Sequence, residues 1–318
     1  MEVVRLSDGP IIRPDMDERL GTNVNGPSLI RVPDWLDDPL GRYYLYFAHH
    51  QGQFIRMAYA NRIEGPYTVF SPGVLSIEDA PFSHHIASPD VHVDEAARKI
   101  VMHYHGCRPT GENPFPHGQL TCYAESADGL NFSSDTTYLA QPYLRTFYRG
   151  GWYYGLSGGF RRHFSRSRDR RRPFEVGPVL EIEGEDFTDF STYDRDDPDA
   201  RPVYRTRHVC FHLRGDDLDV YYSCVGDRPE RIKRTTVDLS GDWEDWRGCE
   251  PTEALQSERD WEGANEPLVR SEGGSKHQPV HELRDPYVHE EDGRGYLFYS
   301  VAGEQGIGLA EVTDDGRD

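Results

Sequence analysis

Short runs of aromatic and β-branched residues, each bounded by Gly, Asp or Pro, recur along the chain, whereas the periodicity of amphipathic helices is nearly absent. The five clearest runs lie at residues 43–48, 99–105, 152–157, 218–223 and 296–300. This composition is typical of short strands. Because the runs return at intervals of about 50 to 80 residues, the pattern indicates an internal repeat.

The repeat can be aligned residue by residue. Residues 285–300 match residues 208–223 without a gap, and an X-Pro-X start followed by an apolar residue also occurs at 26–28, 88–90 and 141–143. Each unit begins with this start, crosses a turn and enters an aromatic strand, and most units continue into a third strand. Three or four antiparallel strands repeated five times predict an all-β fold, a five-bladed β-propeller. A two-sheet sandwich is the alternative, but it does not explain the repeated start.

The repeat predicts one domain over residues 1–318. The expected blades span roughly 22–75, 84–135, 138–182, 203–246 and 277–312. The first twenty residues are expected to supply a strand to the last blade and so close the ring. Two segments that interrupt the rhythm, 183–202 and 247–277, are predicted to be insertions between blades, and long insertions of this kind often form walls or lids.

Composition narrows the class of protein. Acidic residues outnumber basic ones by 55 to 35, giving a net charge of −20, so a general nucleic-acid binder is not expected. No apolar run approaches the roughly 20 residues that span a bilayer, so no membrane partner is predicted. The first residues lack the features of a secretory signal, which predicts a cytoplasmic protein, or a secreted one if a leader has been removed.

The five cysteines contain no CxxC pair, so neither a disulfide framework nor a structural zinc site is indicated. The histidines offer a weaker metal signal. His103 and His105 share a face of one predicted strand, but no carboxylate stands at a matching spacing, and both are expected to pack between blades. No metal site and no cofactor are therefore predicted. The arginine-rich run 161–172 is expected to be a solvated edge of the third blade, with contact to an anionic substrate or a subunit as the alternative.

The first strand of each blade in a propeller faces the central channel. Alternate residues of a strand share a face, so both X positions of X-Pro-X should point toward the axis. The first X positions are Gly26, Ser88, Gln141, His208 and Asp285, the second are Ser28, Asp90, Tyr143, Cys210 and Tyr287, and just upstream lie Asn25, His85, Arg207, Glu282 and Arg284. Burying so many polar side chains costs folding free energy unless the channel mouth is open to water and serves a function. The sequence therefore predicts a functional site there, with Cys210 as a small filling residue.

At these motifs the sequence resembles a known group. Ser88-Pro89-Asp90-Val91, Arg284-Asp285-Pro286-Tyr287-Val288 and the aromatic strands at 43–48 and 296–300 are similar to those of the five-bladed propeller glycoside hydrolases of family 43 and its relatives, including the family 117 anhydrogalactosidases. The resemblance covers roughly residues 22–312. It implies a glycosidase that acts from the chain end on a small oligosaccharide, and the sequence does not determine the oligomeric state. An axial calcium ion, found in some related hydrolases, is not indicated here.

The resemblance also implies catalytic roles. In the family 43 pattern an Asp-Pro on the first blade supplies the general base, a Pro-Asp on the second supplies a helper carboxylate, and a Glu-Gly-Pro on the third supplies the general acid. Only the second element stands here, as Asp90, because Gly26 precedes the first-blade proline and Gln141 precedes the third-blade proline. An Arg-Asp-Pro motif occurs instead on the fifth blade, at Asp285.

Glycoside hydrolysis ordinarily needs two carboxyl groups, one of them protonated. The working hypothesis assigns Asp285 as base toward a water, His208 or Glu282 as proton donor, and Asp90 as the orienting carboxylate, since histidine titrates near neutrality. The predicted substrate-binding residues are Asn25, Trp35, His85, Gln141, Tyr143, Arg207, Arg284 and Tyr287. Each of the two aspartates also has a purely structural interpretation. Asp285 could link adjacent blades, and Asp90 could stabilise a turn.

Two other functions fit the same residues. A polysaccharide lyase would use His208, Tyr143 or Tyr287, and Arg207 with Arg284 to eliminate across a uronic acid, without a carboxylate pair. A non-catalytic propeller that binds sugar or protein is the third, favoured by the missing family carboxylates. An enzyme should have a deep pocket with Asp90 and Asp285 at its floor, whereas a binding propeller should present a flat face rich in exposed aromatic residues.

Overall fold

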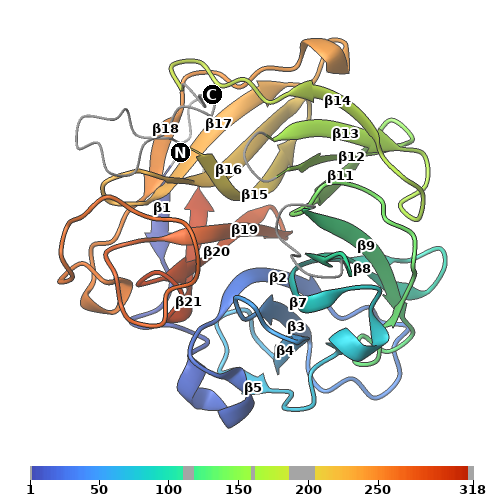
Figure 1. The fold of residues 1–318 in the computed structure, drawn as a ribbon, viewed down its shortest axis with the longest axis horizontal. Coiled ribbons are helices and arrows are strands. Elements are labelled where there is room, and N and C mark those ends of the chain that lie inside the picture. The colour runs from blue at the N-terminus through green and yellow to red at the C-terminus, as the bar shows by residue number, and fades with distance from the viewer. Residues whose placement is uncertain (1, 110–117, 159–161, 186–204, 314–318) are drawn as a thin grey trace.

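The computed structural model describes residues 2–109, 118–158, 162–185 and 205–313. These residues form five antiparallel sheets arranged around a common centre, as Figure 1 shows in the view along the shortest axis of the molecule. The predicted fold class, an all-β five-bladed propeller, is confirmed. No helix in the described ranges is long and apolar enough to cross a membrane.

The sheets follow the chain in order. The first contains β2 (Asn25–Arg31), β3 (Tyr43–Ala48), β4 (Phe54–Ala60) and β5 (Thr68–Val69), with β6 (Leu75–Ser76) also paired to β4. The second contains β7 (Ser83–Asp94), β8 (Lys99–Cys107), β9 (Gln119–Ser126) and β10 (Ser133–Ser134). The third contains β11 (Arg145–Arg149), β12 (Trp152–Ser157), β13 (His163–Ser167) and β14 (Glu175–Val179).

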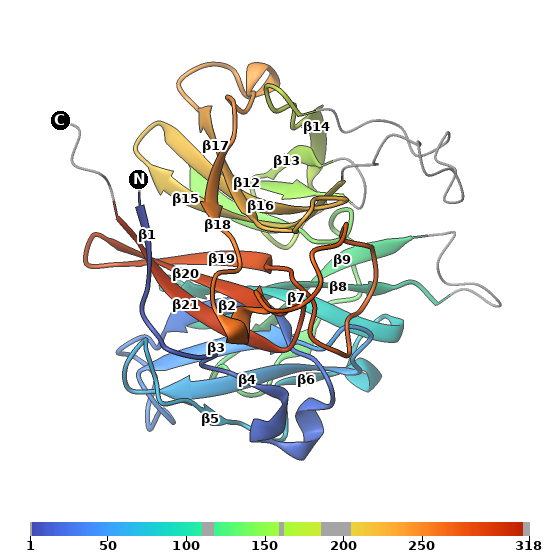
Figure 2. The same ribbon diagram turned by 90° about the vertical axis from the view of Figure 1, so that its left-hand side faces the viewer.

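The fourth sheet contains β15 (Arg205–Arg214), β16 (Asp217–Val225), β17 (Ile232–Asp238) and β18 (Thr252–Leu255). The fifth contains β19 (Arg284–Glu291), β20 (Arg294–Val301), β21 (Gly306–Thr313) and, at its outer edge, β1 (Glu2–Arg5). Short 3-10 turns occur at Pro14–Met16, Glu18–Leu20, Ile77–Asp79, Trp243–Asp245 and Asp260–Glu262. In Figure 2, β1 lies beside β21, so the two ends of the described chain share one sheet.

The aromatic runs of the sequence are the second strands of the five sheets. Tyr44 and Tyr46 of β3 pack against the second blade, whereas Leu45 and Phe47 of the same strand pack against the fifth. A strand that is buried on both faces is apolar throughout rather than alternating. Five buried clusters fill the five interfaces between neighbouring blades in the described part of the chain. The core therefore lies between blades and leaves the centre to polar residues.

The ungapped alignment of two repeat units corresponds to equivalent pairing in the structure. In the fourth blade Cys210 pairs with Tyr221, and in the fifth blade Tyr287 pairs with Phe298, each residue 77 positions after its counterpart. The predicted insertion 183–202 lies almost entirely outside the described residues.

Candidate active site

Four of the five first strands carry a β-bulge close to their start. The pairing register shifts between Asn25 and Ser28, Ala87 and Asp90, Thr206 and Val209, and Arg284 and Tyr287. Gly26, Ser88 and Asp285, each followed by proline, have left-handed φ angles of 59°, 51° and 50°. A bulge redirects the side chain that it carries. In these four blades the side chains of the first X residues Ser88, His208 and Asp285 therefore line the channel mouth, and the second X residues lie one layer deeper. Tyr143 of the third blade, a second X residue outside these bulged strands, lines the cavity.

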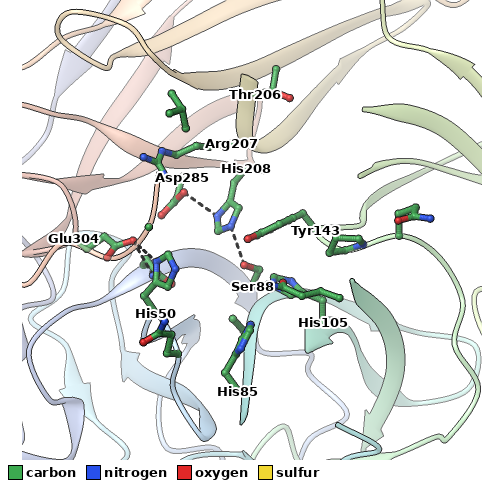
Figure 3. Close-up of a pocket in the computed structure, with 18 of the residues that line it drawn as sticks. His50, His85, Ser88, His105, Tyr143, Thr206, Arg207, His208, Asp285 and Glu304 are labelled. Atoms are coloured by element: carbon green, nitrogen blue, oxygen red, sulfur yellow. Dashed lines mark hydrogen bonds and ion pairs between the residues drawn. The ribbon is translucent and has the colours of Figure 1, made fainter. Parts of the chain in front are cut away.

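A cavity of about 490 Å³ opens at the channel mouth (Figure 3). Its size falls within the ~300–1,000 Å³ range of small-molecule sites. Seven of the predicted site residues line it: Asn25, His85, Gln141, Tyr143, Arg207, His208 and Asp285. The lining also includes Ser88, which was expected to face the channel but was given no role, and His50, His105, Gln119, Arg162, Thr206 and Glu304, which the hypothesis from the sequence had not assigned to the site.

His208 lies at the centre of this cavity, between residues of two other blades. Its Nε2 atom is 2.9 Å from Oγ of Ser88, and its Nδ1 atom is 2.9 Å from Oδ1 of Asp285. Among the described residues Nδ1 has no partner with hydrogen-bond geometry, so its contact with Asp285 is a close polar contact that is not aligned. Ser300 donates a hydrogen bond of 3.3 Å to the other oxygen of Asp285.

Burial and charge set the protonation of this pair. Burial lowers the pKa of His208 below its ordinary value, and Asp285 opposes this only in part. Burial disfavours the charged form of Asp285, but His208, Arg207 and Arg284 more than offset this, so the pKa of the Asp285 carboxyl lies well below its usual range. At neutral pH the pair is therefore a neutral imidazole beside a carboxylate.

A second imidazole–carboxylate pair lines the same cavity. Nδ1 of His50 is 3.0 Å from Oε1 of Glu304. Burial disfavours the Glu304 carboxylate, but the hydrogen bond and charge of His50 hold its pKa below the ordinary value. Asn25 donates to Oε1 of Glu304 at 3.3 Å, and the backbone N–H of Lys276 donates to Oε2 at 2.9 Å. These contacts fix the Glu304 carboxylate in place.

Histidine and tyrosine rings form one wall of the cavity. The Tyr143 ring centroid is 4.2 Å from that of His105 and 4.7 Å from that of His208. Burial lowers the pKa of His85 to about 4 and that of His105 well below its ordinary value, so both are neutral. His103 packs between blades as predicted, with Nε2 3.0 Å from the Arg170 carbonyl oxygen. The same prediction was wrong for His105, because β8 ends at the channel mouth.

Asp90 does not line the cavity, contrary to the expectation that it would lie at the floor. It lies in the layer beneath, where Oδ2 is 2.9 Å from Nε2 of His92 and accepts from the backbone N–H of Thr146 at 3.0 Å. Arg145 donates to the Pro89 carbonyl oxygen and approaches Oδ1 of Asp90 at 3.4 Å. Despite burial, the charges around it hold the pKa of Asp90 well below its usual range.

Tyr287 and Cys210 belong to the same layer. Tyr287, predicted to bind substrate, is outside the cavity lining and donates its hydroxyl to the Leu29 carbonyl oxygen at 2.8 Å. The Arg145 guanidinium lies 5.7 Å from the centroid of the Tyr287 ring. Cys210 is buried as expected, and burial raises the pKa of its thiol to about 12. The bulge explains these positions, because it breaks the shared face on which the prediction relied.

Three further predicted residues lie outside the cavity lining. Glu282 accepts from Nε of the fully buried Arg284 at 2.7 Å, and Nη1 of Arg284 is 3.6 Å from Glu304. This pair therefore lies behind the cavity wall. Glu282 cannot reach a substrate in the cavity, so its predicted role as proton donor is not supported. Trp35 follows β2 at the opposite end of the first blade, where Nε1 donates to Glu95 at 2.8 Å.

Arg207 lines the cavity as predicted, but its positive charge is paired with the carboxylate of Glu230. Nε donates to Oε1 of Glu230 at 2.6 Å, and Nη2 donates to the Glu272 carbonyl oxygen. Burial opposes its charged form, yet Glu230 and the nearby carboxylates raise the pKa of Arg207 above its usual value.

Asp285 and Glu304 are the carboxylates that the described lining residues offer to a calcium ion. Calcium takes six to eight oxygen ligands, whereas the two lining carboxylates, Asp285 and Glu304, each contact a histidine. Within the described ranges no group of three or more His, Cys, Asp or Glu side chains is arranged to hold a metal ion.

Comparison with solved structures places the fold among the five-bladed propellers of the glycoside hydrolases. The GH43_1 enzyme from Xanthomonas citri in complex with xylotriose superposes with a TM-score of 0.64 at 14% identity, covering 98% of this chain and 91% of that one. An α-L-arabinofuranosidase from Lactobacillus brevis gives 0.60 at 12% identity, covering 93% of each chain. These similarities confirm the fold that the family 43 resemblance implied.

A nearer relative defines the family. Uncharacterized protein R118 of Acanthamoeba polyphaga mimivirus is 34% identical over 332 aligned residues, which cover 98% of this chain and 90% of the viral protein. The chain belongs to the family of that protein. No protein-family model matches the sequence.

Proposed function

We propose that this protein is a glycoside hydrolase that releases a sugar from the end of a small oligosaccharide bound in the central cavity. The proposal rests above all on one observation: a buried imidazole–carboxylate pair, His208 with Asp285, within a polar cavity of a propeller glycoside hydrolase fold. The GH43_1 enzyme with a similar fold is described in complex with xylotriose, which supports an oligosaccharide ligand.

The protonation states suggest the roles. The neutral imidazole of His208 is the better general base, because the lowered pKa makes the Asp285 carboxylate a weak one. A water at the Ser88 side of His208 would give its proton to Nε2 and attack the anomeric carbon. The bond to the leaving-group oxygen would break as that oxygen takes a proton. This differs from the hypothesis made from the sequence, which had Asp285 as base and His208 or Glu282 as donor.

The second pair offers the proton donor. Glu304 holds Nδ1 of His50, which leaves the other ring nitrogen of His50 for transfer to the leaving group. Two imidazole–carboxylate pairs would then do the work that two carboxyl groups do in most glycosidases. One water is consumed, and each histidine returns to its resting state by exchange with solvent.

Action at a chain end is supported by the side chains packed beneath the cavity. Arg145 and Asp90 are buried there and contact each other, and Tyr287 lies beside Arg145, which leaves little room for a polysaccharide to thread through. A cavity of this depth also favours an enzyme over a binding propeller with a flat aromatic face.

Elimination across a uronic acid remains the second candidate. It is favoured by the Tyr143 ring, which lies 4.7 Å from that of His208 and could supply an acid. The ion pair between Arg207 and Glu230 weighs against it, because a lyase needs uncompensated cations for the substrate carboxylate.

The test is a panel of neutral and uronate-containing oligosaccharides, followed for new reducing ends and for the ultraviolet absorbance of an unsaturated uronate. Reducing ends without absorbance support hydrolysis, and rising absorbance would identify a lyase. Neither signal on any sugar would contradict both and leave a binding propeller. Asp285→Asn and His50→Gln should each lower kcat about 10²- to 10⁴-fold, whereas Asp34→Asn, an exposed carboxylate on the first blade, should match the wild type.

A further inference from the structure

Three residues of three blades lie in a row of close polar contacts in the cavity. Oγ of Ser88 (second blade) is 2.9 Å from Nε2 of His208 (fourth blade), whose Nδ1 is 2.9 Å from Oδ1 of Asp285 (fifth blade). All three are buried and line the cavity. A hydroxyl, an imidazole and a carboxylate in this order are the parts of a nucleophilic serine site, which is recognised by geometry and not by fold or chain order.

We propose that Ser88 is a nucleophile and that the cavity hydrolyses a carboxylic ester of a small acyl group on a sugar hydroxyl. This goes beyond glycoside hydrolysis, because the bond cleaved is an ester and the attacking oxygen belongs to the protein. Only the choice of a sugar as the alcohol rests on the proposed function.

The backbone at Ser88 suits this role. The residue has a φ of 51°, precedes Pro89 and lies in the bulge of β7. A left-handed conformation at a residue other than glycine costs about 1–2 kcal/mol and is found where surrounding structure enforces it, often at functional sites. Here it directs Oγ out of the strand and toward His208. The serine of the nucleophile elbow in α/β-hydrolases is likewise presented by a strained turn.

The charges suit it as well. A neutral His208 can accept the Ser88 proton at Nε2, and the Asp285 carboxylate stabilises the imidazolium that forms. The Nδ1 contact is close but not aligned, and such contacts commonly tighten only when substrate is bound. A small rotation of the imidazole ring would complete the line.

The reaction balances without a further reactant. Oγ attacks the ester carbonyl as its proton passes to Nε2, and the tetrahedral intermediate expels the sugar alkoxide, which takes that proton. A water then attacks the acyl-serine, gives a proton to Nε2, and releases the carboxylic acid as Oγ recovers its hydrogen. The Tyr143 hydroxyl extends toward His208 and Ser88 in Figure 3, so a phenol donor faces the place where the carbonyl oxygen becomes charged.

Covalent labelling tests the nucleophile directly. The full chain is treated with a fluorophosphonate, which phosphonylates activated serines with loss of fluoride, and the adduct is located by intact mass and peptide mapping. One adduct on Ser88 is expected, absent in Ser88→Ala and strongly slowed in His208→Ala. Ser133→Ala, an exposed serine on the outer strand of the same sheet, is the matched control and should label like the wild type. The absence of an adduct on Ser88 in the folded wild type would overturn the proposal. This outcome is measured on the wild type, so the test does not depend on how the variants fold.

Turnover is measured in parallel on acetylated xylo-oligosaccharides, with acetate and reducing ends followed in the same samples. Acetate release at least about 10³-fold slower in Ser88→Ala than in the wild type is expected. Release of acetate without new reducing ends would support the esterase and contradict the glycosidase. New reducing ends without acetate would support the glycosidase and contradict the esterase.

Discussion

Gly26 lies directly against the imidazole of His208. A β-carbon at Gly26 would be 3.4 Å from Cε1 of His208 and 3.4 Å from Cα of Ser88. The resemblance to family 43 implies an aspartate before this proline, yet here the ring of His208 takes the space. In the proposed mechanism the general base is therefore His208 of the fourth blade, and Gly26 leaves room for its ring.

Gly26→Ala should therefore reduce turnover more than stability. The left-handed φ of 59° costs an alanine about 1–2 kcal/mol, and the added methyl group touches Cε1 of His208 at 3.4 Å, so it should restrict the movement of the ring during proton transfer. Gly150→Ala is the matched control, because Gly150 has a φ of 57° and nothing within 4 Å of a built β-carbon. Comparing kcat and the free energy of unfolding of both variants checks this. Equal kcat values would show that His208 does not need the space.

Asp285→Asn should change the pH profile and not only the rate. The Asp285 carboxylate raises the pKa of His208 against the larger effect of burial, so its removal lowers that pKa further. Activity on the acid side is lost when His208 is protonated, and the acid limb of kcat/KM should move to lower pH in the variant. An unmoved limb would mean that another group titrates there.

Asp90→Asn tests whether Asp90 acts in the reaction or only in the fold. Breaking its buried contacts with His92, Thr146 and Arg145 should cost about 3–5 kcal/mol of unfolding free energy. The kcat of the folded fraction should fall far less than in Asp285→Asn, since Asp90 lies outside the cavity. Full stability with lost activity would restore the orienting role predicted from the sequence. Chemical denaturation and active-fraction kinetics separate the two.

Three neutral histidines, one buried and two half-buried, should make the protein acid-sensitive above pH 4. Burial lowers the pKa values of His49, His85 and His289 to about 4. Between about pH 6.5 and 4 the unfolded chain binds protons that the folded chain does not, so stability falls as pH falls, by up to about 1.4 kcal/mol per unit for each group. His289→Gln should flatten this slope and His84→Gln, at an exposed site, should not. Urea unfolding across the pH range measures both slopes.

The fold was predictable because each blade has a second strand that is buried on both faces. Strands such as Tyr43–Ala48 are apolar on both faces, which is required of a strand between two neighbouring sheets, and their recurrence gives the number of blades. The X-Pro-X starts were equally informative, although their physical basis is a bulge. Since the bulge adds one residue, Asp90 and Tyr287 lie beneath the cavity and not in it.

The site was predicted in part, and its omissions share one cause. The sequence reasoning took only first strands as channel-facing, whereas antiparallel second strands end where first strands begin. His50 follows β3, His105 lies near the end of β8, and Glu304 follows β20, so all three reach the same mouth. The hairpin order contained this information. The prediction that Trp35 binds substrate was wrong for a related reason. Trp35 lies in the turn after a first strand, and that turn is at the end of the blade away from the cavity.

The pairing of β1 with β21 also orders events during synthesis. Within the described chain β1 precedes every other strand and its hydrogen-bonding partner β21 follows them all, and the fifth sheet contributes Asp285 to the cavity. On the ribosome, four sheets can assemble while residues 2–5 wait without their partner. The proposed centre and the closed ring therefore depend on the same sheet, because a polypeptide that stops before β19 lacks Asp285 and leaves β1 without its partner.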